Sequence, residues 1–415
     1  MLKLRHVGLD VHKDSIVMAV ADGGSSPAQI VGTFDWCESR VLSELRKLGP
    51  LGSLKVCYEA GPTGYGLQRF LTSHKVDCVV IAPALVPQMQ GCHIKTDRRD
   101  ACKLAHFLRS GDLTKIWVPD EQTEALRDLV RARDDARLAE RRIRQQLLKF
   151  LLRQGRRCPP GINHWTKAHW TWIRQQRFAP EAQQRVLADA IQTAEAAAAR
   201  IKRLDEDLTQ CVAGWKQAAL VKNLQAFRGI QLVTAVGLAA EIGDFQRFPR
   251  APQFMAFVGL VPRENTTGQT RRQGGLTKAG NRHVRRLLIE AAWQYIGAPA
   301  TLSQKLVDRR RDVPEAVVTI ADRALRRLRH KAHKLSLRKK SSTKIAAALA
   351  RELAGFVWAA ARATAGVVET SSAATPNTPQ KAASKTSSVK RQGSATPNRA
   401  ASSKRLAAAG ATRLK

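Results

Sequence analysis

The chain has 415 residues, enough for about two or three domains, and 44% of them are hydrophobic, as expected for a protein with a buried core. Its 70 lysines and arginines against 34 aspartates and glutamates give a formal net charge of +36, which predicts a polyanionic partner, most simply nucleic acid. The sequence has no apolar run of transmembrane length, no signal-like segment after Met1 and no C-x-x-C pair among its seven cysteines, so we expect neither a membrane protein nor a disulfide-rich secreted one.

The first 110 residues predict an α/β domain, because short apolar segments alternate with amphipathic ones. We expect strands at 4–10, 16–21, 28–34, 54–58 and 78–82, and helices at 38–48, 64–74 and 98–109. Three early strands followed by alternating helices and strands give the order of an RNase H-like sheet. The alternative is a doubly wound nucleotide-binding sheet, which requires a glycine-rich phosphate loop after the first strand, and Asp10-Val11-His12 is not one.

Two predicted strands of this domain end on acidic residues. Asp10 ends the first strand, and Glu59 ends the strand at 54–58, just before the turn-forming cluster Ala60–Gly64. A strand packed on a core holds a carboxylate at its end in a fixed direction, as a metal site requires. An aspartate near a strand end is also common as a turn or cap residue, so Asp10 by itself leaves both interpretations open.

A second pair of acids, Asp97 and Asp100, opens the third predicted helix. Their spacing of three residues places both on one face of that helix. In the alternative interpretation Thr96 caps the helix and the aspartates complement its dipole. That alternative accounts for one aspartate, but it leaves Asp10 and Glu59 unexplained.

Four carboxylates gathered in one place would raise one another's pKa unless a cation lay between them. Mg²⁺ or Mn²⁺ with oxygen ligands is the natural cation for such a cluster. Two such ions about 4 Å apart can activate an attacking oxygen and stabilise a leaving oxygen at a phosphodiester. The acids therefore predict metal-dependent chemistry, with Asp10, Glu59, Asp97 and Asp100 as the ligands.

Residues 116–220 predict a helical, coiled-coil region with helices at 121–155 and 181–211. The second helix carries apolar residues from Leu187 to Leu208 at alternating steps of three and four. Such helices can pair as a hairpin or across a dimer. The arginines along the first helix have few acids to pair with, so we favour phosphate contact over a solvated helix face.

Residues 221–361 predict a mainly α-helical domain with two features suited to nucleic acid. Residues 227–237 resemble a helix–hairpin–helix element, which presents backbone amides to a phosphate, although a structural glycine turn between core helices is the alternative. The polar stretch 263–281 and the residues after it combine glycines, which let a backbone approach a ligand, with cations that suit phosphate. The cations expected to bind nucleic acid are Arg271, Arg272, Lys278, Arg282, Arg285 and Arg286.

The last part of the chain changes composition twice. Residues 315–361 are helical in pattern and strongly basic between Arg323 and Lys340. From about Ala363 the chain is rich in Ala, Ser, Thr, Pro and Lys and nearly free of large apolar residues, which predicts a disordered basic tail. The predicted domains are therefore 1–115, 116–220 and 221–361, followed by the tail 362–415.

Several short segments together resemble the Piv/MooV-type insertion-sequence transposases. Gly8–Lys13, Tyr58–Gly64 and Lys95–Ala101 are similar to the segments that carry the acid quartet of that family. Other segments are similar to its C-terminal transposase domain; they are Gly259–Pro262, Lys278–Asn281 and Arg285–Leu288. The resemblance covers about residues 5–300 in the order of the family.

The resemblance implies a RuvC-like N-terminal domain whose Asp-Glu-Asp-Asp quartet is Asp10, Glu59, Asp97 and Asp100, with Mg²⁺ or Mn²⁺ as cofactor. It also implies a coiled coil leading to a domain with a serine nucleophile. The family places that serine before a glycine, five residues after the proline of Leu-x-Pro, and this position is Thr267 here. No serine lies between Ser110 and Ser303, so Thr267 is the expected nucleophile, with a purely turn-forming role as the alternative.

The resemblance implies an enzyme that cuts and rejoins element and target DNA. Its implied partners are DNA, a structured bridge RNA that guides some members, and further copies of the chain in a dimer or tetramer, in the bacterial cytoplasm at the nucleoid. One alternative function is a Holliday-junction or RNase H-type nuclease that uses the quartet alone. The other is a non-catalytic nucleic-acid-binding derivative of a transposase.

Overall fold

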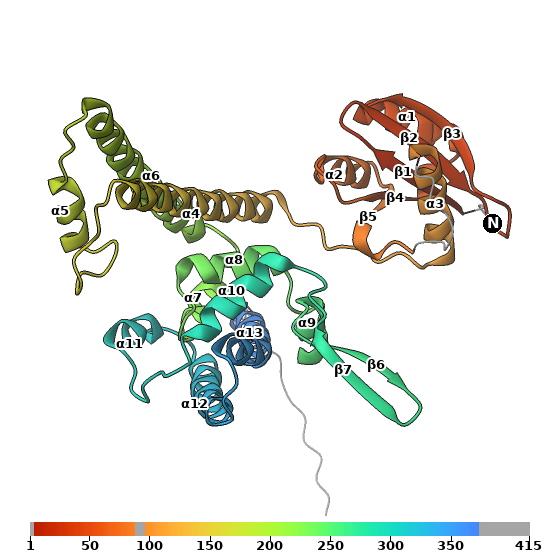
Figure 1. The fold of residues 1–415 in the computed structure, drawn as a ribbon. Helices are drawn as coiled ribbons and strands as arrows, with labels where there is room; N and C mark the ends of the chain where they lie inside the picture. The colour runs from red at the N-terminus through yellow and green to blue at the C-terminus, as the bar shows by residue number, and fades with distance from the viewer. Residues whose placement is uncertain (1–3, 88–95, 373–415) are drawn as a thin grey trace, which may run out of the picture. The chain divides into compact units, whose positions relative to one another are not determined.

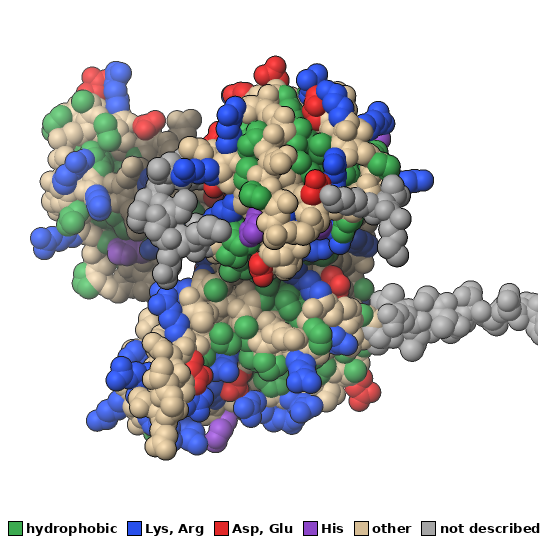
Figure 2. Space-filling model, turned by 90° about the vertical axis from the view of Figure 1, so that its right-hand side faces the viewer, with side chains coloured by type: hydrophobic (Ala, Val, Ile, Leu, Met, Phe, Trp, Pro, Cys, Tyr) green, Lys and Arg blue, Asp and Glu red, His purple; other side chains and the backbone are tan. Residues whose placement is uncertain are grey.

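The structure is a computed structural model that describes residues 4–87 and 96–372. The last helix, α13 (Ser342–Ser372), continues past the boundary predicted at 361. The predicted basic tail lies outside the described residues from position 373 onward. Lysine and arginine side chains are spread over the face seen in Figure 2, in keeping with the net charge.

The N-terminal part is a mixed five-stranded sheet in the order β3-β2-β1-β4-β5, which confirms the predicted α/β class (Figure 1). Its strands are β1 (Arg5–Val11), β2 (Ser15–Ala21), β3 (Gln29–Asp35), β4 (Leu54–Glu59) and β5 (Asp77–Ile81). The pairs β1–β2 and β2–β3 are antiparallel, while β1–β4 and β4–β5 are parallel. The central strand β1 therefore has a parallel neighbour on one side and an antiparallel neighbour on the other.

Helices cover both faces of this sheet. Successive residues of β1 point to opposite faces, so both faces have to be covered. On one face Val7 and Leu9 pack in the core formed with α1 (Glu38–Leu48) and α2 (Gly66–Ser73). The other face is covered by α3 (Asp97–Ser110), which packs closely over Gly8. A Cβ on Gly8 would lie 2.4 Å from the carbonyl oxygen of Ala101, so only glycine lets α3 approach β1 this closely. Short 3₁₀ turns, Leu51–Ser53 and Pro83–Leu85, complete this part.

Two helices of 33 residues each, α4 (Glu121–Arg153) and α6 (Glu181–Ala213), pair with each other in the same chain (Figure 1). A short helix, α5 (Lys167–Gln175), lies in their connection and was not predicted. Leu187, Ala194 and Leu208 of the apolar seam of α6 are almost wholly inaccessible. The two helices therefore pair as a hairpin within one chain, while the seam residues Ala190, Ala197, Ile201 and Leu204 are only partly buried.

The remainder is mainly helical, as predicted, and is built around α8 (Leu232–Ile242), whose last eight residues are all buried. The other elements are α7 (Ala218–Leu224), α9 (Ala251–Phe257), β6 (Pro262–Thr267), β7 (Thr270–Leu276), α10 (Arg282–Trp293), α11 (Gln304–Arg310) and α12 (Glu315–Leu337). The hairpin β6–β7 forms where the sequence predicted only a polar stretch. Across 4–87 and 96–372, no helix combines the length and the apolarity that crossing a membrane requires.

Candidate functional site

The two strand-end acids lie side by side at the same end of two adjacent inner strands. Asp10 and Glu59 are on neighbouring parallel strands, one register step beyond the pair Leu9 and Tyr58. Side chains two residues apart share a face of a strand, so Asp10 lies on the same face as Gly8, which α3 covers. The sheet therefore directs the carboxylate of Asp10 to the face on which α3 begins.

The other two acids, Asp97 and Asp100, lie in the first turn of α3. Thr96 caps this helix, its Oγ1 accepting the backbone N–H of Arg99 at 3.3 Å. The capping part of the alternative interpretation is therefore correct. Because the cap uses a threonine hydroxyl, neither aspartate is needed as the capping side chain.

The structure brings Asp10 close to the aspartates of α3. Burial raises the pKa of Asp10, and the charges of Asp97 and Asp100 raise it further, while His12 opposes the shift. A carboxyl group whose ionised form is disfavoured in this way is stabilised as a carboxylate by a bound cation. Its environment therefore fits the predicted divalent-metal site.

A residue that the sequence analysis did not assign, His12, lies in the same cluster. Its Nε2 is 3.3 Å from Oδ2 of Asp10 and 3.5 Å from Oδ1 of Asp97. One ligand atom from each of these three residues lies within 4.8 Å of the others, a spacing that a single metal ion can span. The signal for His12 was its position two residues after Asp10, just beyond the end of β1 at Val11, which keeps its side chain near the strand-end acid. These carboxylate oxygens are suitable donors for Mg²⁺ or Mn²⁺.

Thr267 is the last residue of β6, and it pairs with Thr270 across the two-residue loop of the hairpin. Gly268 in that loop has φ +55°, a conformation that favours glycine. Thr267 is exposed, as are almost all residues of both strands. The predicted nucleophile thus lies beside a turn, with its hydroxyl on an accessible ribbon.

Of the six cations predicted to bind nucleic acid, three have partners within the fold. Arg285 donates from Nη1 to the carbonyl oxygens of Val258 (2.9 Å) and Ala279 (3.0 Å), so it braces the fold. Two others have acidic partners, since Arg286 pairs with Asp134 and Glu290, and Arg271 pairs with Glu264. The exposed cations Arg272, Lys278 and Arg282 are the best placed of the six to meet a phosphate.

The predicted helix–hairpin–helix element is the connection between α7 and α8, with Gly229 at φ +81°. A Cβ at Gly229 would lie 2.5 Å from the carbonyl oxygen of Ala291 in α10, so the hairpin packs against that helix. Arg309 donates to the carbonyl oxygen of Ile230 at 2.7 Å, bracing the hairpin from α11. These contacts support the structural-turn alternative, and phosphate binding by this hairpin stays a prediction.

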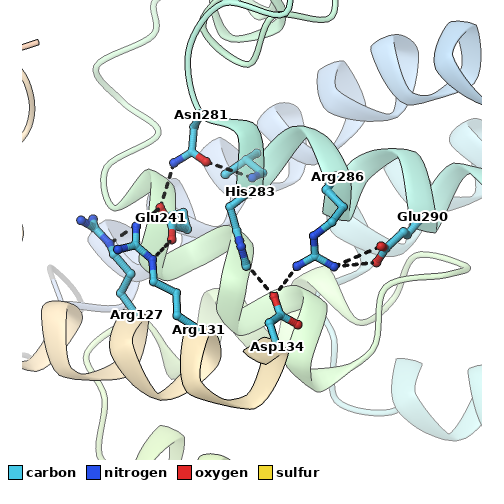
Figure 3. A network of polar contacts seen from close by, with 9 residues as sticks. Arg127, Arg131, Asp134, Glu241, Asn281, His283, Arg286 and Glu290 are labelled. Atoms are coloured by element: carbon cyan, nitrogen blue, oxygen red, sulfur yellow. Dashed lines mark hydrogen bonds and ion pairs between the residues drawn. The ribbon is translucent and has the colours of Figure 1, made fainter. Parts of the chain in front are cut away.

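A buried acid, Glu241 of α8, joins the coiled coil to the start of α10 (Figure 3). Its side chain is only 2% exposed. It accepts hydrogen bonds from Arg131 Nε of α4 (2.9 Å) and from Asn281 Nδ2 (2.8 Å), and Arg127 Nε lies 3.9 Å away. Asn281 in turn caps α10, its Oδ1 accepting the backbone N–H of Val284. Glu241 thereby fixes the end of the basic stretch against α4.

Glu241 gives this junction a pH dependence. Burial would raise its pKa, but hydrogen bonds from Arg131 and Asn281 and the charges of Arg131 and Arg127 outweigh burial and lower it. A carboxyl group whose pKa is lower in the folded chain than in the unfolded one stabilises the fold above its unfolded pKa. That contribution is lost as the pH falls through the folded value.

We expect Glu241→Gln to lower the free energy of unfolding at pH 7 by about 3 kcal/mol, because it leaves the buried guanidinium of Arg127 without a carboxylate and removes the ion pair with the more exposed Arg131. The difference from the parent should shrink as the pH falls through the lowered pKa of Glu241, where its carboxylate becomes protonated in the folded chain. Urea denaturation at several pH values measures both effects. Glu290→Gln, at the exposed end of the same network, is the matched control and should change stability by less than about 0.5 kcal/mol. Equal effects of the two variants would show that Glu241 has no special role.

Two family models match the chain. Residues 7–154 match a model described as "Transposase", of the DEDD type named for IS110. Residues 221–306 match the model described as "Transposase IS116/IS110/IS902 family". The two matches cover the sheet with its acid cluster, the helix α4 and the region of β6–β7 and α10.

Curated relatives are similar over most of the chain. The putative transposase y4qE of Sinorhizobium fredii is 41% identical over 358 residues, which is 86% of this chain and 88% of that protein. The transposase for insertion sequence element IS1533 of Leptospira borgpetersenii is 32% identical over 342 residues, or 82% of this chain and 99% of that protein. A shorter match, 28% over 203 residues, links the chain to the transposase for IS1328 of Yersinia enterocolitica, covering 49% of this chain and 59% of that protein.

Proposed function

The chain belongs to the IS110/IS116/IS902 family of insertion-sequence transposases, as its resemblance to the Piv/MooV type predicted, and on that premise we propose that it cuts and rejoins element and target DNA. The N-terminal sheet is an RNase H-like, RuvC-like catalytic domain in this proposal. Asp10, Glu59, Asp97 and Asp100 hold the divalent metal, and Thr267 supplies the nucleophilic hydroxyl.

The observation that carries this proposal is the convergence of Asp10 and Asp97, whose ligand atoms lie within 4.8 Å in a cluster with His12. Glu59 on the adjacent parallel strand and Asp100 one helical turn from Asp97 extend the same group. Strands and a capped helix hold these acids rigidly, which favours a fixed metal geometry. When bound, Mg²⁺ or Mn²⁺ would activate the attacking oxygen and stabilise the leaving oxygen at a phosphodiester.

The chain's own hydroxyl accounts for rejoining. Oγ1 of Thr267 attacks a DNA phosphorus, the bond from phosphorus to the sugar oxygen breaks, and the proton lost by threonine is balanced by the one gained by the leaving hydroxyl. The phosphoester keeps the bond energy, so a second DNA hydroxyl can reverse the step on a new partner. Exposed cations on the ribbon and beside it, Arg272, Lys278 and Arg282, bind the phosphates of that DNA.

The proposed partners follow the family resemblance. They are the element ends, the target DNA and a structured guide RNA, with the chain acting as a homodimer or homotetramer in the bacterial cytoplasm at the nucleoid. The high net positive charge supports binding to both kinds of nucleic acid. The guide would supply target choice by base pairing.

The test is a strand-transfer assay with purified protein, its copurifying RNA and DNA carrying the element ends. We expect cleavage and joining in Mg²⁺, and loss of both when EDTA removes the metal. Treatment with RNase before the assay should abolish target choice. Cutting without joining would favour the RuvC-type nuclease, and binding without cutting would favour the non-catalytic derivative.

A further inference from the structure

A cavity of about 620 Å³ lies between the segment that follows α10 and one face of α12. Tyr295, Ala298 and Ala332 contribute to its lining, and Tyr295 and Ala332 are almost fully buried. The cavity is within the range of small-molecule and cofactor sites, about 300–1,000 Å³. Helix α12 begins at Glu315, beyond both ranges matched by the family models, so those matches assign it no role.

Two arginines and two histidines of α12 lie at the rim of this cavity, and the arginines make it positively charged. Arg326, Arg329, His330 and His333 of α12 line it, and their spacings of three and four residues place them on one helical face. No acidic residue is among the residues that line the cavity. Arg329 donates from Nε to the carbonyl oxygen of Ala298 at 2.8 Å, which holds its guanidinium at the rim.

The neighbouring basic face of α12 is different, because its cations Arg327 and Lys331 share an acidic partner within the fold. Arg327 and Lys331 both contact Glu352 of α13, each at 2.7 Å. The acid that precedes them on α12, Asp322, pairs with Arg310. The sequence has no further acid between Asp322 and Glu352, so α12 itself supplies no acid to pair with the arginines that line the cavity.

The basic character continues beyond the cavity to the end of the helix. Lys334, Arg338, Lys339 and Lys340 are all exposed. A row of cations that leads into a concave site attracts and guides a polyanionic strand. A row of this kind alone would suit any nucleic acid, whereas a cavity with apolar lining also offers space for an unpaired base.

We propose that this cleft binds a single-stranded segment of nucleic acid, with one unpaired base in the cavity and its flanking phosphates on Arg326 and Arg329. Arginine suits this role because its planar guanidinium donates two hydrogen bonds to a phosphate. The exposed Gly297 and the partly exposed Ala298 give the cavity an accessible apolar surface that an unpaired base can contact. This site is additional to the acid quartet, and binding there does not require strand cleavage.

The test measures binding by the full-length protein to labelled 15-nucleotide strands of DNA and RNA and to the matching DNA duplex, by fluorescence anisotropy at several salt concentrations. Arg326→Gln with Arg329→Gln removes two rim charges. We expect about a tenfold or greater loss of single-strand affinity and a salt slope smaller by about 1.4, at roughly 0.7 per phosphate contact. Arg327→Gln with Lys331→Gln is the matched control. It also removes two positive charges from α12, but from the face that contacts Glu352, so it should change affinity by less than about threefold.

A second variant separates the cavity from general electrostatics. Ala298→Trp fills the cavity without changing charge, so it should weaken single-strand binding by about fivefold or more and leave duplex binding unchanged. Thermal melting of each variant checks that the fold is retained. If Ala298→Trp loses affinity only for the DNA strand or only for the RNA strand, that result identifies which of the two the site binds. An equal loss of affinity for both would show that the site recognises the phosphates and bases that DNA and RNA share. Parental affinity in Ala298→Trp, or equal losses for strand and duplex in the rim variant, would overturn the proposal.

Discussion

Replacing Asp10 with asparagine is expected to reduce metal-dependent DNA cleavage by about 10³–10⁴-fold, because a metal ion contributes several kcal/mol to stabilising the transition state and each 1.4 kcal/mol is a factor of ten. Asparagine keeps the size of the side chain and removes its charge. Burial raises the pKa of Asp10 and the charges of Asp97 and Asp100 raise it further, so a cation bound there would favour its carboxylate, and losing that carboxylate should weaken the affinity for the cation.

Two measurements distinguish a metal site from a structural role for Asp10. Titration with Mn²⁺, followed by electron paramagnetic resonance, should show weaker metal binding in Asp10→Asn and Asp100→Asn, while thermal melting without metal stays close to that of the parent. Asp112→Asn is the matched control, since Asp112 is an exposed aspartate just after α3 and outside the cluster. Parental cleavage rates in both Asp10→Asn and Asp100→Asn would exclude the quartet as the catalytic centre.

Replacing Thr267 with alanine is expected to remove the covalent protein–DNA adduct altogether, a loss of roughly 10³-fold or more if the hydroxyl is the nucleophile. The hydroxyl is accessible, because Thr267 is exposed beside the loop of the β6–β7 hairpin. The threonine methyl crowds the attacking oxygen and restricts χ1, so Thr267→Ser should form the adduct faster than the parent.

The neighbouring hydroxyls provide the controls for this prediction. Thr270 pairs with Thr267 across the hairpin, and Thr266 donates from Oγ1 to Glu264 at 3.0 Å. Thr270→Ala and Thr266→Ala should keep the adduct, as detected by denaturing electrophoresis of labelled DNA bound to protein. If Thr267→Ala retains the adduct and one of these controls loses it, the nucleophile is the neighbouring threonine. If all three retain it, the hairpin supplies no nucleophile.

The sequence alone determined the N-terminal sheet and its strand-end acids. Apolar alternation is a local property, so the strands that carry Asp10 and Glu59 could be located from their own residues. Thr96 as the cap of α3 was equally local, because a helix cap depends on residues within one turn. The heptad spacing of α6 predicted a helix with an apolar seam, and it left the partner of that seam undetermined.

The sequence did not reveal features that lack an apolar period or depend on distant partners. The ribbon β6–β7 is exposed on both faces, so it has no alternation to detect. Arg285 and Arg286 read as free cations in the sequence. The structure gives them partners as distant as Val258 and Asp134, and a partner so far along the chain leaves no mark on the local pattern.

The sequence by itself determined which residues are candidates for chemistry: four acids at strand and helix ends, one threonine beside a glycine and a large excess of cations. Only the tertiary structure decided which of these act together. It placed His12 between Asp10 and Asp97 and buried Glu241 against Arg131. It also divided the basic residues of α12 into a face that pairs with Glu352 and a face that lines a cavity. The physical reason is that charge and hydrogen bonding act over a few ångströms in space, whereas sequence patterns report only on neighbours along the chain.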